Sequence, residues 1–492
     1  MEPMNLVYVM SDQHNRRMLS CYGHPVVKTP NLDALAARGV RFANAYTNCP
    51  ICVPARASFA TGRYVHDIGY WDNGTPYDGR VPSWGHRLTA QRHNVTTIGK
   101  LHYRSTEDDL GFSDQRIPMH VHKGEGDIFG MIRDPMPRVP GARRRIVNAG
   151  PGESDYSHYD RAVAEHAVRW LHDEASRHDR PWVLFVSFVC PHPPWKAPQE
   201  FFDMYRLDQI DLPPTWQQLT WSMHPAMRAH RYRNEADEQH DEATLRRTIA
   251  TYYALCSFLD HNVGRVLRAV EEAGLADRTR IVYTTDHGES LGAHGLWGKS
   301  TMFEDAVGIP FIMAGPDLPR GTVVDENVTL VDSFPTILEA VGAHATAAEA
   351  DLPGSSLWPI ARGEAALDRP AFSEYHAAGS PTGAFMLRRG RYKYVLHVGL
   401  PDQLFDLERD PHETTNLAED PAYAETCRAY EHELRTIVDP EAADAAAKAH
   451  QRSMIDAAGG AEAVLAAGPP FVHGTPTPPE FLKYREGDRI RA

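Results

Sequence analysis

The chain has 492 residues, of which 42% are hydrophobic and 24% charged, the balance of a globular protein large enough for a deep core and more than one domain. Its formal net charge is −14, and binding to phosphate backbones needs a clustered surplus of Lys and Arg that this balance does not supply. No apolar run approaches the roughly 20 residues of a membrane span, and the run at residues 5–10 is too short for a signal-peptide core. We therefore expect a cytoplasmic protein with neither a nucleic acid nor a membrane as its partner.

The cysteines are few and scattered along the chain, at positions 21, 49, 52, 190, 256 and 427. In a reducing cytoplasm, disulfides between them are not expected. Only Cys49 and Cys52 have the C-x2-C spacing of a zinc site, and no second pair accompanies them. The sequence therefore argues against a structural zinc site.

Short apolar runs that end in turn residues recur between helical patterns, which is typical of buried parallel strands in an α/β fold. These runs cover residues 6–10, 95–98, 182–189, 281–283 and 309–313. Thr29 and Pro30 mark the start of a helix that Gly39 ends, and a longer helical pattern covers residues 248–273. We predict an α/β fold with a large mixed, mostly parallel sheet flanked by helices.

The pattern changes near residue 365. Two short strand-like pieces at 384–388 and 392–397 are separated by Gly390 and Arg391, which indicates a hairpin in a smaller α+β domain. An Ala-rich helical stretch then follows Pro440, and the segment from Gly468 is rich in proline. We predict a large α/β domain, a small antiparallel-sheet domain, and a helical segment with an extended tail, over residues 1–365, 366–438 and 439–492.

Polar residues stand directly after four of the predicted strands. They are Asp12 and Gln13, Lys100 and His102, His192, and Asp286 and His287. Ligands of open α/β sheets bind outside the carboxyl ends of the strands. We therefore expect these side chains to meet on one rim of the sheet.

The most specific segment is Cys-Val-Pro-Ala-Arg at residues 52–56. Pro54 suits the first turn of a helix, so Cys52 would lie at a helix N-terminus, where free N–H groups favour an anion. This C-x-P-x-R segment resembles the signature of the sulfatase family, in which a separate enzyme oxidises the cysteine to formylglycine.

The resemblance extends over most of the chain, to about residue 420. Further segments resemble the family's motifs in order and spacing: residues 99–102, 191–193, 286–289, 294–299, 391–394, 404–407, 410–411 and 416–417. This similarity implies an alkaline-phosphatase-like catalytic domain over residues 1–365 and a sulfatase-like small C-terminal domain.

The resemblance implies one divalent metal ion, Ca²⁺ or Mn²⁺. Its ligands would be Asp12, Gln13, Asp286, His287 and the modified Cys52. Carboxylate and amide oxygens suit a hard cation, and the single imidazole makes a transition ion plausible beside calcium. Most sulfatases have Asp-Asp and Asp-Asn at the positions where this chain has Asp-Gln and Asp-His. The Asp-Gln and Asp-His variants also occur in choline-sulfatase-like and phosphonate-monoester-hydrolase-like relatives.

By the same resemblance, Cys52 becomes 3-oxoalanine (formylglycine), whose hydrate attacks the sulfur of a sulfate monoester. Arg56 and Lys100 would hold this nucleophile. His192 would be the general acid for the leaving alcohol, and His102 would take the proton that allows sulfate to be released. The predicted catalytic and substrate-binding residues are Cys52, Arg56, Asn73, Lys100, His102, His192 and Lys299.

Three alternatives compete with a sulfatase of aryl, alkyl or choline esters. A phosphonate monoester or phosphodiester hydrolase could use the same site, because phosphorus and sulfur oxyanions share their geometry. A two-metal phosphatase is disfavoured because Cys52 stands where such enzymes need Ser or Thr, and a noncatalytic binding protein would not need so complete a polar set.

The predicted partners are a small-molecule sulfate ester and a formylglycine-generating enzyme during maturation. A homo-oligomer is also expected, in which the tail from Gly468 docks on a neighbouring subunit. The alcohol is not predicted, but the loops at residues 103–140 and 194–236 are expected to select it. In the first loop, His120, His122, Lys123 and Arg133 could contact a charged or sugar-like substrate, but the sequence favours solvated loop residues at these positions.

Overall fold

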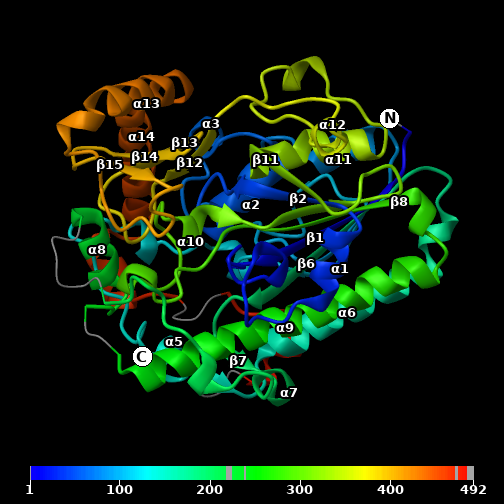
Figure 1. Cartoon of the computed structure of the whole chain (residues 1–492), viewed down its shortest axis with the longest axis horizontal. Coiled ribbons are helices and arrows are strands. Elements are labelled where there is room, and N and C mark those ends of the chain that lie inside the picture. Colours follow the sequence, from blue (N-terminus) through cyan, green and yellow to red (C-terminus); the bar gives the residue numbers. More distant parts are fainter. Residues whose placement is uncertain (1, 218–223, 238–239, 471–474, 485–492) are drawn as a thin grey trace.

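A nine-stranded sheet forms the centre of the fold (Figure 1). The structure is a computed structural model that describes residues 2–217, 224–237, 240–470 and 475–484. In space the strands follow the order β11-β2-β10-β8-β1-β6-β3-β4, and β9 pairs with β2. Their bounds are β1 (Asn5–Asp12), β2 (Val40–Tyr46), β3 (Val95–Lys100), β4 (Asp114–Met119), β6 (Val183–Pro191), β8 (Thr279–Thr285), β9 (Gly308–Ile309), β10 (Phe311–Ala314) and β11 (Thr322–Thr329).

β1 lies between β6 and β8 and runs parallel to both. β3 also runs parallel to β6, whereas β10 is antiparallel to β8 and to β2. Every residue of β1 is buried, which explains why its first part is a continuous apolar run rather than an alternating one. The predicted α/β class, with a mixed and mostly parallel sheet, is confirmed.

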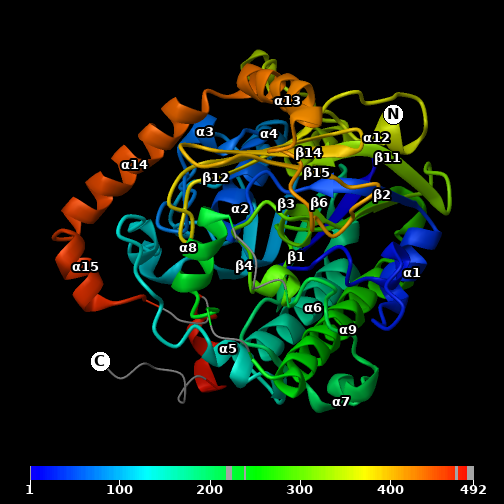
Figure 2. The same cartoon turned by 60° about the vertical axis from the view of Figure 1, so that its left-hand side comes forward.

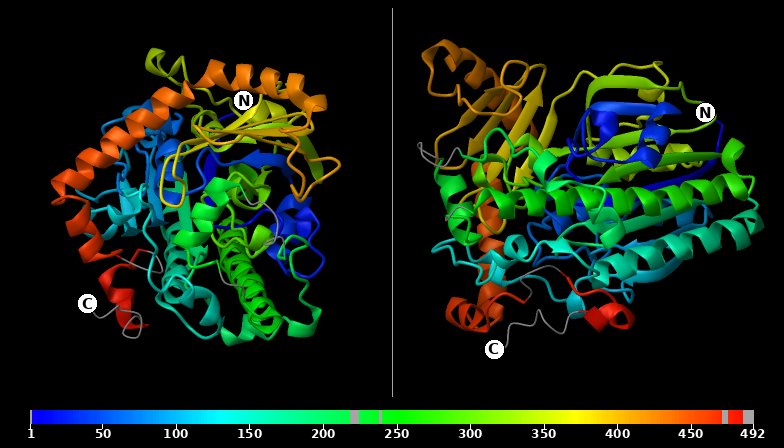
Figure 3. Two further views of the ribbon diagram at one scale, coloured as in Figure 1. Left: turned by 90° about the vertical axis from the view of Figure 1, so that its left-hand side faces the viewer. Right: turned by 60° about the horizontal axis from the view of Figure 1, so that its bottom comes forward.

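Helices cover both faces of this sheet (Figures 1 and 3). Leu6 and Tyr8 of β1 pack in an apolar cluster with α2, α4 and α11, while Val7 and Val9 pack in a second cluster with α1, α6 and α9. Alternate side chains of one strand therefore belong to opposite layers of the core. The helices span α1 (Pro30–Ala37), α2 (Cys52–Thr61), α4 (Trp84–Ala90), α6 (Asp155–Asp173), α9 (Glu242–Glu272) and α11 (Ser333–Ala340).

The start of α1 is stabilised from another helix. Thr29 makes no capping hydrogen bond with its side chain, contrary to the expectation from sequence. The carboxylate of Asp260 on α9 instead accepts hydrogen bonds from the backbone N–H groups of Asn31 (3.1 Å) and Leu32 (2.8 Å). One turn later, a Cβ at Gly264 would overlap the Asn31 side chain, so glycine permits this close approach of the two helices.

A second, four-stranded sheet lies beside the first and is antiparallel throughout, in the order β12-β13-β14-β15. Its strands are β12 (Ala371–Tyr375), β13 (Ala384–Arg389), β14 (Tyr392–His397) and β15 (Gln403–Asp406), and α13 (Ala424–Ile437) packs on it. The predicted hairpin is confirmed, and Gly390 in its turn has a φ of +52°.

After α13, the helices α14 (Pro440–Ala457) and α15 (Ala461–Ala467) form an arm along the outside of the molecule (Figure 2). Gln451 on α14 donates to Asp72 of the large unit (2.8 Å) and to the carbonyl of His376 beside the small sheet (2.6 Å). The tail beyond it is not extended throughout, because residues Pro479–Tyr484 form a 3-10 helix. The domain boundaries proposed from sequence stay a prediction.

Short elements complete the fold. They are α3 (Val65–Ile68), α5 (Arg144–Val147), α7 (Gln199–Phe202), α8 (Pro225–Arg233), α10 (Glu304–Val307), α12 (Trp358–Ala361), β5 (Gly150–Pro151) and β7 (Lys196–Ala197). Among the described residues, no helix combines the length and the apolar character needed to cross a membrane.

Candidate active site

The polar residues predicted at the four strand ends come together at the carboxyl edge of β1, β3, β6 and β8. A cavity of about 190 Å³ opens there. Of the predicted residues, Gln13, Cys52, Asn73, His102, His192 and Lys299 line it. The remaining predicted residues, Asp12, Arg56, Lys100, Asp286 and His287, are at most 1% exposed and contact one another or the cavity residues.

Three of the buried side chains could hold a metal ion. Ligand atoms of Asp12, Asp286 and His287 lie within 4.8 Å of one another. His287 Nε2 is 3.6 Å from one carboxylate oxygen, Oδ1, of each aspartate. Two ligands at right angles around a calcium ion, with bonds of about 2.3–2.6 Å, lie roughly 3.3–3.7 Å apart. The spacing therefore fits a cation between these groups.

The hydrogen bonds of this cluster also fit a cation. In the described part of the chain, Asp12 Oδ1 and His287 Nε2 are buried without a hydrogen-bond partner. His287 Nδ1 donates to the carbonyl of Gly288 (3.0 Å), so its Nε2 carries the lone pair that a metal requires. Leaving such groups buried and unpaired is costly, and a bound cation would remove that cost.

The outer oxygens of the two aspartates are already paired. Lys100 Nζ donates to Asp12 Oδ2, and Arg56 Nε donates to Asp286 Oδ2 (2.8 Å). Burial alone would raise the pKa of Asp12, but Lys100, His192 and Lys299 hold it well below its usual value. Lys100 and Arg56 thus pair the Oδ2 atoms of the two aspartates, while both Oδ1 atoms lie near His287 Nε2.

Cys52 is the first residue of α2, as predicted, and it is 2% exposed. Its sulfur lies 3.8 Å from Lys299 Nζ and 3.7 Å from Asn73 Nδ2. Asn73 Oδ1 in turn accepts a hydrogen bond from the N–H of Val53 (3.2 Å) in the first turn of the helix. Burial would raise the pKa of the Cys52 thiol, but nearby Lys299 and Lys100 outweigh it and the pKa is lowered.

Gln13 is held by two charged neighbours. Its Nε2 donates to Glu289, and its Oε1 accepts a hydrogen bond from Lys299 Nζ (2.7 Å). Glu289 also accepts from the N–H groups of Leu291 (2.9 Å) and Gly298 (2.6 Å). Glu289 therefore positions Gln13 and, through Gly298, the segment that carries Lys299. The sequence analysis assigned no role to Glu289, and the role of Gln13 as a metal ligand stays a prediction.

The two predicted acid–base histidines are neutral in this environment. Burial lowers the pKa of both His102 and His192, and Lys100 and Lys299 add to this effect. His192 Nδ1 donates to the carbonyl of Pro193 (2.6 Å), which leaves its Nε2 without a proton. His102 Nε2 hydrogen-bonds to the hydroxyl of Thr475 (2.5 Å), which belongs to the C-terminal segment of the same chain.

The rest of the cavity was not predicted residue by residue. It is lined by Asp127, Val139, Ala142, Arg145, Pro193, His230, Arg233, Asn234, Trp297, Gly298, Ser300, Ala378, Pro469 and Thr475. Several belong to the two loops expected to select the alcohol, but the individual loop residues singled out from sequence are not among them. Arg133 is instead buried against α14, where it contacts Asp444 (3.3 Å).

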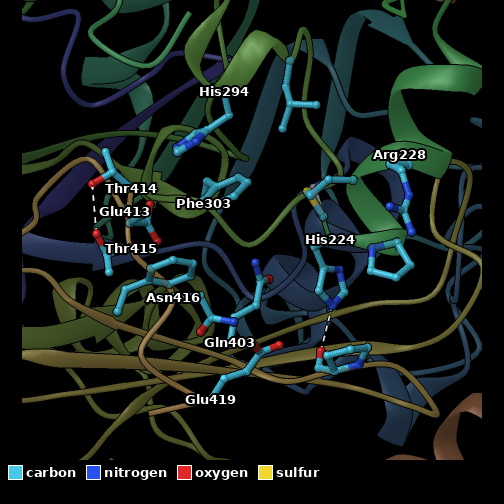
Figure 4. Close-up of a pocket in the computed structure, with 15 residues that line it drawn as sticks. His224, Arg228, His294, Phe303, Gln403, Glu413, Thr414, Thr415, Asn416 and Glu419 are labelled. Atoms are coloured by element: carbon cyan, nitrogen blue, oxygen red, sulfur yellow. Dashed lines mark hydrogen bonds between the residues drawn. The ribbon is translucent and has the colours of Figure 1, made fainter. Parts of the chain in front are cut away.

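A larger cavity of about 690 Å³ lies between α8, the loop before α10 and the loop after β15 (Figure 4). His294 lines it and stacks on Phe303, with ring centroids 4.0 Å apart. Figure 4 shows these two rings lying face to face, away from His224 and Gln403. None of the predicted catalytic or metal-binding residues lines this cavity.

Comparisons with known proteins agree with this geometry. A family model described as Sulfatase matches residues 4–343, and one described as N-sulphoglucosamine sulphohydrolase, C-terminal, matches residues 292–439. A choline-sulfatase of Rhizobium meliloti (strain 1021) is 32% identical over 433 residues, which cover 85% of this chain and 83% of that protein. An arylsulfatase K of Rattus norvegicus is 29% identical over 462 residues, covering 88% and 78%.

Among solved structures, the phosphonate monoester hydrolase of Agrobacterium radiobacter superposes with a TM-score of 0.71 at 24% identity, over 88% of this chain and 95% of that one. This likeness supports the fold. Membership of the family is supported by two other findings. The Sulfatase model matches residues 4–343, and the choline-sulfatase is similar over most of both chains. The chain belongs to the sulfatase family and is a sulfuric ester hydrolase.

Proposed function

We propose that the chain hydrolyses sulfate monoesters of aryl or alkyl alcohols through a formylglycine made from Cys52, with one divalent cation, Ca²⁺ or Mn²⁺. One observation carries the proposal: the residue 52 side chain lies at the N-terminus of α2, beside Lys299 and the buried cluster of Asp12, Asp286 and His287. The sulfur of Cys52 marks where the oxygens of the hydrated aldehyde would stand. Maturation by a formylglycine-generating enzyme, a cytoplasmic location and a homo-oligomeric state are parts of the same proposal.

The hydrated aldehyde supplies an oxygen nucleophile for sulfur and a second hydroxyl whose deprotonation releases sulfate and restores the aldehyde. The cation, held by Asp12, Asp286 and His287 with Gln13 beside them, would supply positive charge next to the reacting oxygens. Arg56 fixes Asp286 and also donates to the carbonyl of Lys100 (2.8 Å). These contacts keep the site rigid, so that little reorganisation is needed as charge develops.

Lys299 and Asn73 are placed to bind the sulfate group, since both reach the sulfur position of residue 52. The leaving alcohol needs a proton, and His192 Nε2 can provide it only after accepting one, because its Nδ1 proton is engaged by Pro193. Lys299 Nζ, which donates to Gln13 Oε1 (2.7 Å) and lies 3.8 Å from the residue 52 sulfur, can supply it directly or by way of His192. Neutral His102 is suited to accept the proton of the second hydroxyl.

The test is co-expression with a formylglycine-generating enzyme, followed by mass spectrometry of the peptide spanning residues 43–63 and an assay with 4-nitrophenyl sulfate. We expect loss of sulfur from Cys52 and turnover that rises with the converted fraction. Cys52→Ala should lose turnover and keep the fold. Full turnover by Cys52→Ala, or by wild-type protein without any conversion, would overturn the proposal.

The choice between sulfate and phosphonate esters is made by a second assay. An aryl sulfate and a phenylphosphonate monoester with the same leaving group are compared on one converted preparation. The similarity to a choline-sulfatase and to arylsulfatase K supports the sulfate ester. Lys100 and His102 also support it, because they keep the sulfatase pattern at positions where the phosphonate hydrolase group tends to differ. A higher kcat/KM on the phosphonate would reverse this choice.

A further inference from the structure

The catalytic cavity carries more positive charge than a single sulfate group needs. Among the described residues that line it, Lys299, Arg145 and Arg233 are basic, and Asp127 is the acidic residue that accompanies them. His230, which also lines the cavity, adds no positive charge, because burial lowers its pKa to about 4. Lys299 lies beside Cys52, where it would bind the sulfate group of the substrate. The two arginines have no role in the reaction proposed above.

Arg145 has no acidic partner in the described part of the chain. Its Nη2 donates to Asn234 Oδ1 (3.3 Å) and to the carbonyl of Trp297 (3.5 Å), and its Nε is buried without a partner. Burial lowers the pKa of Arg145, with partial compensation from the more distant Glu289. Arg145 is half-buried, and a guanidinium that is partly removed from water and supported only by neutral oxygens can bind an anion.

Arg233 is 4% exposed and stands over the ring of Phe129, with 5.4 Å from its guanidinium carbon to the ring centroid. Its Nη1 makes a long hydrogen bond to the carbonyl of Pro137 (3.4 Å). Asp127 favours its charge from a distance, but in the described structure no ion pair within 4.0 Å joins them. Burial raises the pKa of Asp127, which weakens the compensation further.

Both arginines line the same cavity as Cys52, Asn73 and Lys299. A Cβ on Gly298 would lie 3.7 Å from Arg145 Nη1, so this guanidinium packs against the residue next to Lys299. On the other side of the cavity, the N–H of Asp127 donates to the carbonyl of Asn73 (3.0 Å). Asp127, whose charge favours that of Arg233, is thus joined to the other predicted sulfate ligand. An alcohol leaving the sulfur would therefore occupy the space that the two arginines border.

We propose that Arg145 and Arg233 bind a second anionic group on the alcohol, so that the preferred substrates are sulfate esters of acidic alcohols. The group is a carboxylate or a second sulfate, and Arg145 is its principal ligand. This inference rests on the proposed function, because it names the substrate class of the same site. A cationic alcohol such as choline would place its charge next to two unpaired guanidinium groups and is disfavoured.

The experiment compares aryl sulfates that differ only in charge. In 4-(carboxymethyl)phenyl sulfate and its carboxamide, the methylene group insulates the ring, so the leaving phenols have nearly equal acidity. We expect kcat/KM to be roughly 10- to 100-fold higher for the carboxylate, chiefly through KM, as for a charge-assisted hydrogen bond. 4-(Sulfomethyl)phenyl sulfate distinguishes a site for a second sulfur oxyanion from one for a carboxylate.

Variants locate the effect. Arg145→Met should abolish the preference for the charged ester while leaving turnover of the carboxamide, and Arg233→Met should reduce it. Arg144→Met is the matched control, because Arg144 is the exposed neighbour on the same short helix and its removal changes the net charge equally. Equal kcat/KM for the two esters in the wild-type enzyme, or a preference that survives in the double variant, would overturn the proposal.

Two further measurements separate this inference from the proposed function. Calorimetric binding of the carboxylate and carboxamide esters to Cys52→Ala needs no turnover, so equal affinities overturn the inference even if the catalytic proposal fails. Turnover of the carboxamide ester reports the catalytic proposal alone. Choline sulfate and its uncharged isostere 3,3-dimethylbutyl sulfate form a second pair, in which a preference for choline sulfate would also overturn the inference.

Discussion

Arg56 illustrates how a single side chain supports the catalytic cluster. Its guanidinium bonds to Asp286 (2.8 Å), to the carbonyl of Lys100 (2.8 Å) and to the hydroxyl of Ser187 (2.9 Å), and it is 1% exposed. A lysine ammonium also has three donors, but they share one nitrogen, so it cannot reach acceptors that are spread around the separate nitrogens of a guanidinium. The position therefore demands arginine for its shape as well as for its charge.

Replacing Arg56 should destabilise the fold as well as the reaction. Arg56→Met leaves Asp286 buried without its cation, and breaking such a pair costs about 3–5 kcal/mol. We expect a lower melting temperature, measured in a chelator so that no metal compensates, and an intermediate effect for Arg56→Lys. Arg206→Met, a change at an exposed arginine, should leave the melting temperature unchanged. A melting temperature for Arg56→Met equal to that of wild type would contradict this account.

Removal of the metal should have two effects. Without a cation, Asp12 Oδ1 and His287 Nε2 stay unpaired, so a chelator should lower both turnover and melting temperature. Addition of Ca²⁺ or Mn²⁺ should restore both, with about 2.7 kcal/mol of stabilisation at a hundredfold excess over the dissociation constant. Asp12→Asn should not respond to the ion, whereas Asp203→Asn, at an exposed carboxylate, should respond as wild type does. Unchanged turnover after exhaustive chelation would refute the metal assignment.

The sequence could predict the residues of the site that lie at strand ends, but not the two arginines that line the rest of the cavity. Asp12 and Lys100 end β1 and β3, and Asp286 directly follows β8, so the geometry of a parallel sheet places them together. Arg145 and Arg233 lie on short helices within long connections, where no periodic pattern fixes their direction. Their approach to the cavity depends on tertiary contacts, which local sequence does not encode.

At the scale of elements, the packing of α1 on α9 depends on one glycine. Gly264→Ala would force its methyl group against Asn31, whose side chain is held by Asp260 (2.7 Å). Overpacking of this kind typically costs about 1–3 kcal/mol, so the denaturation midpoint should fall. Arg268→Ala on the exposed side of the same helix is the control for helix propensity. A denaturation midpoint for Gly264→Ala as high as that of Arg268→Ala would show that α1 and α9 can move apart without a loss of stability.

The elements that sequence misjudged have local physical reasons. The run at residues 309–313 was expected to be one strand, but it is divided into β9 and β10 at Pro310, which has no N–H for a ladder hydrogen bond. Thr29 stands where a cap is usual, yet the long-range carboxylate of Asp260 takes the N–H groups of α1. Strand positions and helix periodicity were therefore predictable, while partners distant in sequence were not.

At the scale of the whole molecule, a buried charge network joins the small sheet to the large unit. Lys393 on β14 bonds to Glu304 (3.2 Å) and to Glu413, and Arg16 contacts the other oxygen of Glu304 (2.6 Å). Burial raises the pKa of Glu413 to about 7, whereas Lys393 and Arg16 overcome burial at Glu304 and hold its pKa at about 2. Glu413 therefore holds its proton more tightly than a free glutamate, and Glu304 holds its proton less tightly.

The docking of the small sheet should depend on pH through Glu413. Its pKa is higher in the folded than in the unfolded chain, so the folded state binds the proton more tightly, and stability falls as the pH rises from about 4.5 to 7. Glu413→Gln should lack this decline, with a difference from wild type on the order of 1–3 kcal/mol across the range. Melting temperatures at pH 5 and pH 7.5 measure it. Parallel pH profiles for the two proteins would contradict the assignment.

The C-terminal segment also bears on when the nucleophile can be made. Thr475 touches His102 and, through its carbonyl, Tyr156 (2.7 Å), while Pro469 and Thr475 line the cavity in which Cys52 lies. An oxidising enzyme has to bind the Cys52 side chain in its own active site. In the folded chain this side chain is buried and out of reach of another enzyme. On the function proposed above, Cys52 must therefore be oxidised before the C-terminal segment packs against the cavity. A molecule that folds before oxidation keeps an unmodified cysteine and stays inactive.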